Sequence, residues 1–425
     1  MPMRWGKTKV AIDWVNCLSL IEGRELRCLV VCPLSVTSVW PDEILKHTPD
    51  EYGTNVLWRV INFEQLWTRR RVGDTVVALD NRGLMEFAPD VVIIDESHRI
   101  GNPSTLACRN ACKIGQRARY RLIMTGTMFH RKPFYVFGQA KFYDPSIFGS
   151  AFGPFKKKIA VFGGYGGYEV LRYTNLKWMM KQMKTFTYIE RYVPPRDTAV
   201  NVMRFDLTGR NLAAYVMMER ESMVKGEDWT VVSPIVLSRH LRCQQIAGGW
   251  LKYEGTYRRV GRDKKAMALD RFRDYEAQGI QKIVVGCRFV PELADVADIA
   301  RQCGYKVVLM HGGTTDRGRR IRYFRDTPDP CVFVAQIGTG AEGIDLSAAD
   351  TMMFYSLSES FLTHDQFSRR IEKFEDTRVL QYDYVIARGT RDEVTFEALQ
   401  LKQDVARFIV DHPARVERIT ARNRG

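Results

Sequence analysis

Gly6-Lys7-Thr8 is the first group of residues whose types and spacing could do chemistry. In a phosphate-binding loop with this ending, backbone N–H groups and a helix N-terminus face the phosphates of a nucleotide. The Lys reaches the β and γ oxygens, and the Thr hydroxyl holds Mg²⁺. The tripeptide also recurs by chance in long chains, so this interpretation depends on the residues that follow. It predicts that Gly6, Lys7 and Thr8 bind nucleotide, with Thr8 also a metal ligand.

Two carboxylates follow an apolar run in Val91-Val92-Ile93-Ile94-Asp95-Glu96-Ser97-His98. A buried strand would deliver them at its carboxyl end, where α/β sheets bind their ligands. Asp95 can hold Mg²⁺ through water there, and Glu96 can orient or deprotonate an attacking water. A strand that simply ends in a polar turn is the alternative. Together with the phosphate-binding loop upstream, the pair favours an ATPase.

Short apolar runs alternate with longer helical patterns, which is typical of parallel α/β units. We predict a helix over residues 7–20 and a first series of strands over residues 28–33, 56–61, 91–94 and 121–124. A second series covers residues 282–285, 306–310, 332–335, 351–355 and 380–386. Between the two series, residues 150–168 read as a mobile loop or hairpin and residues 208–250 as mainly helical.

The chain of 425 residues carries 64 Lys and Arg against 49 Asp and Glu, a net charge of +15. This surplus favours a polyanionic partner such as nucleic acid, with a basic but otherwise ordinary enzyme as the alternative. Hydrophobic residues at 45% and charged residues at 27% are typical of a globular protein. The apolar runs are too short to span a bilayer. The nine Cys include no CxxC pair, which indicates reduced core thiols.

In their order along the chain, these segments resemble the superfamily-two helicases, specifically the Swi/Snf branch of ATP-driven DNA translocases. In the first half, the resemblance lies in Val30-Val31-Cys32-Pro33-Leu34-Ser35, Val60-Ile61-Asn62-Phe63-Glu64, Asp95-Glu96-Ser97-His98 and Thr125-Gly126-Thr127. It implies that Asp95 and Glu96 are catalytic, with Asp95 holding the metal shell. It also implies DNA contacts for Pro33, Ser35 and Glu64. The resemblance also implies that His98, Thr125, Gly126 and Thr127 couple hydrolysis to DNA contact.

The second half carries five further matches in the same order. They are Val284-Val285-Gly286-Cys287-Arg288-Phe289, His311-Gly312-Gly313, Gly340-Ala341-Glu342-Gly343-Ile344-Asp345-Leu346, Gln366-Phe367-Ser368-Arg369-Arg370-Ile371-Glu372-Lys373 and Gly389-Thr390-Arg391-Asp392-Glu393. The resemblance implies that Arg288, Phe289 and His311 contact nucleic acid. It places Gly343 and Asp345 at the cofactor, and Gln366, Arg370 and Lys373 among the catalytic residues.

The resemblance implies an α/β fold of two RecA-like parallel-sheet lobes with a mainly helical insertion between them. The expected domains are residues 1–200 for lobe 1, with a helical protrusion near residues 145–195, then residues 201–260 for the inter-lobe region and 261–425 for lobe 2. The implied cofactors are ATP and Mg²⁺. The implied track is double-stranded or branched DNA rather than single strands, and a protein partner is left open. The compact chain favours a phage or prokaryotic source and a cytoplasmic location.

Two departures from the family pattern keep alternatives open. The second Arg of the last motif falls on Lys373, which keeps the charge but loses the bidentate fork. An arginine finger contributes about 10³–10⁵ in rate, so this position predicts a slow ATPase. Arg369, one residue out of register, is a substitute for the missing arginine. The other departure is Arg4, which stands two places before Gly6 where the family has a small residue. One alternative is therefore a hydrolysis-deficient nucleic-acid clamp, and another is a strand-separating helicase acting on forks or RNA.

The family also has a strand before the phosphate-binding loop, and the sequence begins too close to Gly6 to supply one. Losing a central strand costs more than the 5–15 kcal/mol by which a typical domain is stable. Unless another segment fills that place, we expect that Met1 is an internal or misassigned start, or that the chain is a fragment.

Several basic clusters have two interpretations. Residues 69–71, residues 156–158 and the group Arg317, Arg319, Arg320 and Arg322 could hold phosphates or could be solvated faces. Trp178 with Met179, Met180 and Met183 has helical spacing, which favours a core position over a base-stacking platform.

Overall fold

The computed structural model describes residues 6–48, 53–72, 75–126, 133–167, 169–188, 198–226, 229–233, 235–340, 344–373 and 377–421. The chain divides into two compact units, Met1–Val193 and Pro194–Gly425, here called unit 1 and unit 2. The three-part division expected from the sequence stays a prediction.

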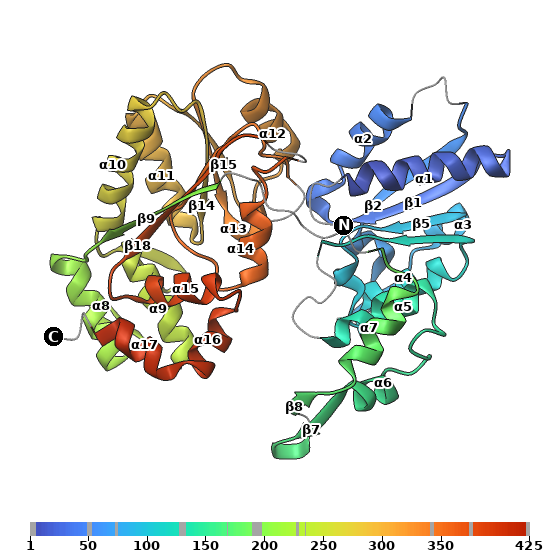
Figure 1. Cartoon of the computed structure of the whole chain (residues 1–425), viewed down its shortest axis with the longest axis horizontal. Coiled ribbons are helices and arrows are strands. Elements are labelled where there is room, and N and C mark those ends of the chain that lie inside the picture. Colours follow the sequence, from blue (N-terminus) through green and yellow to red (C-terminus); the bar gives the residue numbers. More distant parts are fainter. Residues whose placement is uncertain are drawn as a thin grey trace. The chain divides into compact units, whose positions relative to one another are not determined.

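Unit 1 is built on a parallel sheet in the strand order β2-β1-β5-β6. Its strands are β1 (Leu26–Cys32), β2 (Val56–Asn62), β5 (Val91–Ile94) and β6 (Tyr120–Ile123). Helices α1 (Lys7–Glu22) and α2 (Val39–His47) cover one face, and α4 (Leu106–Gly115) and α5 (Val136–Tyr143) lie on the other (Figure 1). Both faces of β1 and β5 are therefore buried, which explains their unbroken apolar runs.

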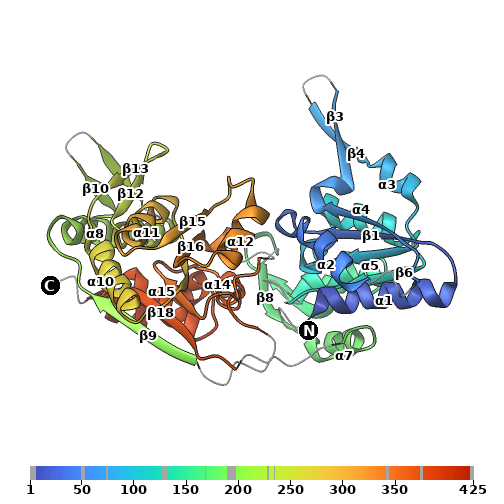
Figure 2. The same cartoon turned by 90° about the horizontal axis from the view of Figure 1, so that it is seen from above.

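The remaining elements of unit 1 lie around this sheet. A hairpin of β3 (Trp67–Val72) and β4 (Thr75–Asp80) projects from it (Figure 2). A second group consists of α6 (Phe152–Ile159), β7 (Ala160–Gly163), β8 (Glu169–Tyr173) and α7 (Leu176–Lys184). Helix α3 (Arg82–Phe87) and the short 3₁₀ turns η1 (Leu34–Val36), η3 (Phe63–Leu66), η4 (Ser97–Ile100), η5 (Pro133–Tyr135) and η6 (Tyr165–Gly167) complete the unit.

The loop or hairpin expected over residues 150–168 is wrong for its first part. Phe155 and Ile159 lie four residues apart in α6 and are both buried, so this stretch gains more from apolar burial as a helix. The hairpin itself is β7 paired with β8. The core position expected for the methionines near Trp178 is confirmed, because Met179 and Met183 of α7 are buried.

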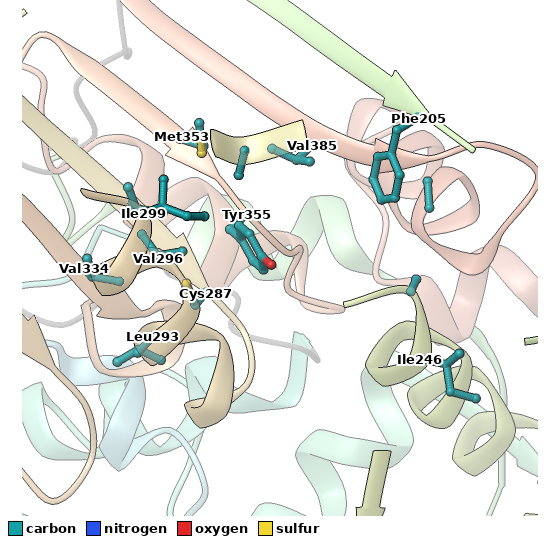
Figure 3. Close-up of a cluster of buried hydrophobic side chains, with 14 of the residues drawn as sticks. Phe205, Ile246, Cys287, Leu293, Val296, Ile299, Val334, Met353, Tyr355 and Val385 are labelled. Atoms are coloured by element: carbon teal, nitrogen blue, oxygen red, sulfur yellow. The ribbon is translucent and has the colours of Figure 1, made fainter. Parts of the chain in front are cut away.

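Unit 2 is built on a six-stranded parallel sheet in the order β15-β16-β14-β17-β18-β9. Its strands are β9 (Thr198–Phe205), β14 (Lys282–Cys287), β15 (Lys306–Met310), β16 (Cys331–Gln336), β17 (Thr351–Phe354) and β18 (Leu380–Ala387). On one face, Val334, Met353 and Val385 of three strands join side chains of α11 (Val290–Gln302) in a buried cluster (Figure 3). On the other face, α12 (Arg317–Asp326), α13 (Ile337–Gly340) and α14 (Phe361–Ser368) bury a second cluster.

Further helices enclose this sheet. Helices α8 (Gly209–Glu221), α9 (Val236–Ala247) and α10 (Asp263–Ala277) share the cluster of α11. Two hairpins join it, β10 (Met223–Lys225) with β11 (Thr230–Val232) and β12 (Trp250–Tyr253) with β13 (Thr256–Arg259). The chain continues through α15 (Arg391–Gln400), α16 (Val405–Asp411) and α17 (Pro413–Thr420), which bury a small cluster of their own.

The expected α/β fold with two parallel-sheet lobes is confirmed. Each of the nine expected strands is present within two residues of its predicted ends. Strand β9 was not predicted. The described helices include none long and apolar enough to cross a membrane.

Candidate functional site

The start of α1 has the geometry of an anion-binding helix end. Gly6 precedes the helix in the left-handed conformation, with φ of 72°, and a Cβ at this position would meet nothing within 4 Å. Among the described residues, no side chain caps the helix, and its first turn contains no acidic residue. Backbone N–H groups at such a helix end attract phosphate. Lys7 is the first helical residue, and Thr8 follows it, so the structure places both predicted phosphate ligands in the first turn.

Asp95 directly follows β5 at the carboxyl edge of the sheet. Its Oδ2 accepts a hydrogen bond from Trp40 Nε1 at 3.3 Å, and its Oδ1 accepts one from the backbone N–H of Glu96 at 2.9 Å. Burial, and then the charge of Glu96, raise the pKa of Asp95 to about 6, against the opposing charge of Lys7. Two neighbouring carboxylates in a partly buried position are stabilised by a cation.

Glu96, His98 and Thr125 form a hydrogen-bonded triangle beside Asp95. The Nδ1 of His98 lies 3.2 Å from Glu96 Oε2 and 3.2 Å from Thr125 Oγ1. Thr125 Oγ1 also donates to Glu96 Oε2 at 3.4 Å. Glu96 has the left-handed conformation, with φ of 53°, which is uncommon for a residue with a side chain and occurs often at functional sites. The triangle joins the turn after β5 to the turn after β6.

Buried contacts hold this triangle in place. The backbone N–H of Ser97 donates to Met124 O at 2.8 Å, and Ser97 Oγ donates to Gln139 Oε1 of α5 at 2.8 Å. Gly101 and Gly138 allow a close backbone approach here, because a Cβ at Gly138 would lie 2.1 Å from Ile100 O. The positions of Glu96 and His98 are therefore set by backbone packing as well as by their own side chains.

The residues present fit ATP with Mg²⁺ as a cofactor. The helix end with Gly6 and Lys7 suits phosphates, and the carboxylates of Asp95 and Glu96 suit a divalent cation. The described residues include no group of three or more His, Cys, Asp and Glu that could hold a metal without such a ligand. Mg²⁺ is usually bound by one or two carboxylates together with substrate phosphates and waters.

The predicted DNA contacts of unit 1 follow two neighbouring strands. Pro33 and Ser35 come after β1 and are both buried. Ser35 is 5% exposed, and its Oγ has no hydrogen-bond partner among the described residues. Glu64 follows β2 and is exposed in η3, a turn that Asn62 and Gln65 cap reciprocally. All three lie at the same edge of the sheet as Asp95.

The last predicted motif of unit 2 lies on and after α14. Gln366 is half-buried within the helix, Arg370 is 5% exposed just after it, and Lys373 is exposed. The carbonyl of Arg370 accepts from the backbone N–H of Leu346 at 3.2 Å, which ties this motif to the segment of Asp345. Asp345 is exposed, and its Oδ1 accepts from both the N–H and the Oγ of Ser347.

The structure places Arg288, Phe289 and His311 after β14 and β15, at the carboxyl edge of the sheet in unit 2. Arg288 is held within the unit: its Nη2 lies 2.9 Å from Glu359 Oε1, and its Nη1 donates to Gln244 Oε1. Phe289 is 7% exposed. The Nδ1 of His311 accepts from the N–H of Gly313 at 3.2 Å. Their roles at nucleic acid stay predictions, as do the roles of Thr127 and Gly343, which lie outside the described residues.

Sequence reasoning missed the residues that hold the predicted ones. Gln244 and Glu359 fix Arg288, and Gln139 fixes Ser97, although each lies more than 40 positions away from its partner. Neither a local motif nor a periodicity links such pairs. The hydrogen bond from Trp40 to Asp95 likewise spans 55 positions.

Comparisons with known proteins show the family of the chain. Residues 3–245 match the SNF2-related domain, and residues 264–375 match the helicase conserved C-terminal domain. SWI/SNF-related matrix-associated actin-dependent regulator of chromatin subfamily A-like protein 1 of Xenopus tropicalis is 23% identical over 94% of this chain and 41% of its own length. Human DNA annealing helicase and endonuclease ZRANB3 is 22% identical over 95% of this chain and 38% of its own.

Among solved structures, the Sulfolobus solfataricus SWI2/SNF2 ATPase core in complex with dsDNA is 20% identical and has a TM-score of 0.41. The match covers 98% of this chain and 91% of the Sulfolobus chain. The chain spans about two fifths of the length of the two curated relatives. Because the SNF2-related domain matches more than half of its residues, the chain belongs to the SNF2-related family.

Proposed function

We propose that the chain is an ATP-dependent DNA translocase, a motor that couples ATP hydrolysis to movement along DNA or to its remodelling. The observation that carries this proposal is the cluster at the carboxyl edge of the sheet in unit 1. There Asp95 lies near Lys7, and Glu96, His98 and Thr125 lie within 3.4 Å of one another. A phosphate-binding helix end beside two carboxylates is suited to nucleotide hydrolysis.

In this proposal each residue of the cluster has one role. Lys7 and Thr8 bind the phosphates and Mg²⁺, and Asp95 holds the metal shell through its carboxylate. Mg²⁺ bound with ATP neutralises the charge that develops on the phosphates. Glu96 orients and deprotonates the attacking water. His98 links Glu96 to Thr125 by hydrogen bonds. Thr125 lies in the turn that the family resemblance assigns to DNA coupling.

Unit 2 has a part in the proposal through its last motif. The resemblance implies catalytic roles for Gln366, Arg370 and Lys373. Lys373 stands where the family has an arginine, and a Lys gives no bidentate contact to a phosphate. This residue favours slow turnover and supports the second candidate, a nucleic-acid clamp that binds ATP without efficient hydrolysis.

DNA is the proposed track for two reasons. The net charge of +15 favours a polyanion. The human relative is named a DNA annealing helicase, and this chain shares the family of such proteins. Double-stranded or branched DNA is proposed over single strands.

ATP hydrolysis measured with single-stranded, duplex and branched DNA tests the proposal. We expect duplex or branched DNA to raise kcat, and Lys7→Ala to abolish the activity because it removes the charge beside the phosphates. Equal DNA affinity with and without ATP, together with an absence of turnover, would establish the clamp instead. Stimulated hydrolysis that Lys7→Ala leaves unchanged would refute the assigned site.

A further inference from the structure

The segment of residues 150–188 carries a concentration of positive charge that the proposed site does not use. Seven of its side chains are basic and one, Glu169, is acidic. The segment comprises α6, the β7–β8 hairpin and α7, which Figure 1 shows beyond α4 and α5 in unit 1. We call it the basic extension. Its basic residues are Lys156, Lys157, Lys158, Arg172, Lys177, Lys181 and Lys184.

Helix α7 separates its charges from its apolar residues. Lys177, Lys181 and Lys184 are spaced four and three positions apart and are exposed, so they lie on one face of the helix. Met179 and Met183 are buried on the opposite face. The lysines therefore form a row along the solvent side of a helix that is anchored on its other side.

Helix α6 adds its charges at the beginning of α7. The Nζ of Lys158 lies 3.5 Å from the centroid of the Trp178 ring, and Lys158 O accepts from Asn175 Nδ2 at 2.8 Å. The carboxyl end of α6 thus meets the first turn of α7. Lys158 therefore lies beside the helix that carries the row of lysines.

An aromatic cluster makes this surface rigid. Phe134 stacks on Phe162 with centroids 6.1 Å apart, and Phe148 lies 5.7 Å from Trp178. These rings belong to a core separate from those beside the sheet. A charged surface on a packed base keeps its shape, so binding an anion there costs little ordering of the backbone.

Ion pairs with other described residues do not neutralise the charges of the extension. None of the seven forms an ion pair within the ranges that the structure describes. Two of the five arginines of α12 differ in this respect, because Arg320 pairs with Asp316 at 2.7 Å and Arg325 with Asp326 at 2.6 Å. Unneutralised lysines on a fixed surface raise the potential around them and attract a polyanion.

We infer that the basic extension is a second DNA contact, which binds the phosphate backbone of a duplex outside the ATP-dependent site. Lysines in a helical row supply point charges rather than the donor pattern that reads bases, so this contact is independent of sequence. The inference rests on the proposed function for its choice of DNA as the polyanion. The contact holds the DNA to unit 1 through the hydrolysis cycle.

The test is the salt dependence of duplex binding by the full chain, measured by fluorescence anisotropy between 50 and 200 mM KCl. Each phosphate contact adds about 0.9 to the slope of log affinity against log salt. We therefore expect Lys177→Gln with Lys181→Gln and Lys184→Gln to reduce that slope by about 2 to 3. Replacing the same three lysines by Arg retains the slope, because the charge is kept.

A matched control removes three exposed lysines elsewhere, by Lys252→Gln, Lys306→Gln and Lys402→Gln. We expect the control to bind as the wild type does, and both triple variants to keep the wild-type ATPase rate without DNA. Equal slopes for the extension variant and the wild type would overturn the inference, as would an equal reduction in the control. If DNA fails to stimulate hydrolysis by the wild type, the proposed function fails, and this readout is separate from the slope.

Discussion

Two adjacent carboxylates receive different environments at the end of one strand. Asp95 is held by Trp40 and by the backbone of Glu96, and its pKa is raised to about 6. Glu96 turns away in the left-handed conformation and reaches His98 and Thr125. A pair of titratable groups in different surroundings is how a site assigns separate roles to chemically similar residues.

Glu96→Gln tests this division of roles. The amide keeps the size of the side chain but cannot take a proton, so we expect kcat for ATP hydrolysis to fall by about 10²–10⁴ while ATP binding is retained. Glu86→Gln, at an exposed position of α3, is the matched control. Wild-type turnover in the Glu96 variant would assign the water-activating role to another residue.

His98 lies between the hydrolytic residue and the turn after β6. We expect His98→Ala to lower the DNA-stimulated rate about tenfold, within the range of measured coupling energies, and to change the DNA-independent rate much less. The two rates are compared in one steady-state assay. A proportional loss in both would place His98 in the hydrolytic step rather than in coupling.

Glu292 makes the stability of unit 2 depend on pH. It is fully buried, accepts from Phe289 N and Ser356 Oγ, and burial raises its pKa from 4.5 to about 7. Because the folded state holds this proton more tightly, stability falls as the pH rises from about 4.5 to 7. Between pH 5 and pH 8, we expect the free energy of unfolding of Glu292→Gln to rise relative to that of the wild type by up to about 3 kcal/mol. The Tm of the variant relative to the wild type should rise with it. A Tm difference that stays constant with pH would contradict this.

At the scale of elements, strands that form apolar runs in the sequence were predictable, and β9 was not. Strands β1, β5 and β14 are apolar on both faces and therefore appear as unbroken runs in the sequence. Strand β9 has one buried residue, Phe205, and pairs with β18, about 180 residues downstream. Its pattern contains no local signal for that partner.

The strand expected before Gly6 stays a prediction. In the described part of the sheet, β6 pairs with β5 on one side only. Tyr120 of β6 contacts Trp14 of α1, with ring centroids 6.3 Å apart.

Helix α13 provides a matched pair of glycines. A Cβ at Gly340 would lie 2.4 Å from the ring of Phe367, whereas one at Gly338 would meet nothing within 4 Å. We expect Gly340→Ala to destabilise unit 2 by about 1–3 kcal/mol through overpacking. Gly338→Ala is expected to leave the Tm unchanged or slightly raised, because Ala is the better helix former. Thermal unfolding measures the Tm of both variants. Equal Tm values would refute the close packing of Phe367 on α13.

For the whole molecule, both units follow one plan, a parallel sheet with its predicted functional residues at the carboxyl edge. In unit 1 these include Glu64, Asp95 and Thr125, and in unit 2 Arg288 and His311. The sequence predicted this plan because each residue lies within two positions of the end of its strand. Partners such as Gln244 and Glu359 come from other elements, so only the folded unit reveals them.

The displacement of a third strand from a triplex most directly tests the claim that the chain moves along DNA. A triplex strand is removed by passage of a translocase and does not require the duplex to be unwound. We predict displacement with ATP, none with a non-hydrolysable analogue, and none by Lys7→Ala or Glu96→Gln. Displacement without ATP, equal displacement by these variants, or an intact triplex beside active DNA-stimulated hydrolysis would contradict the account.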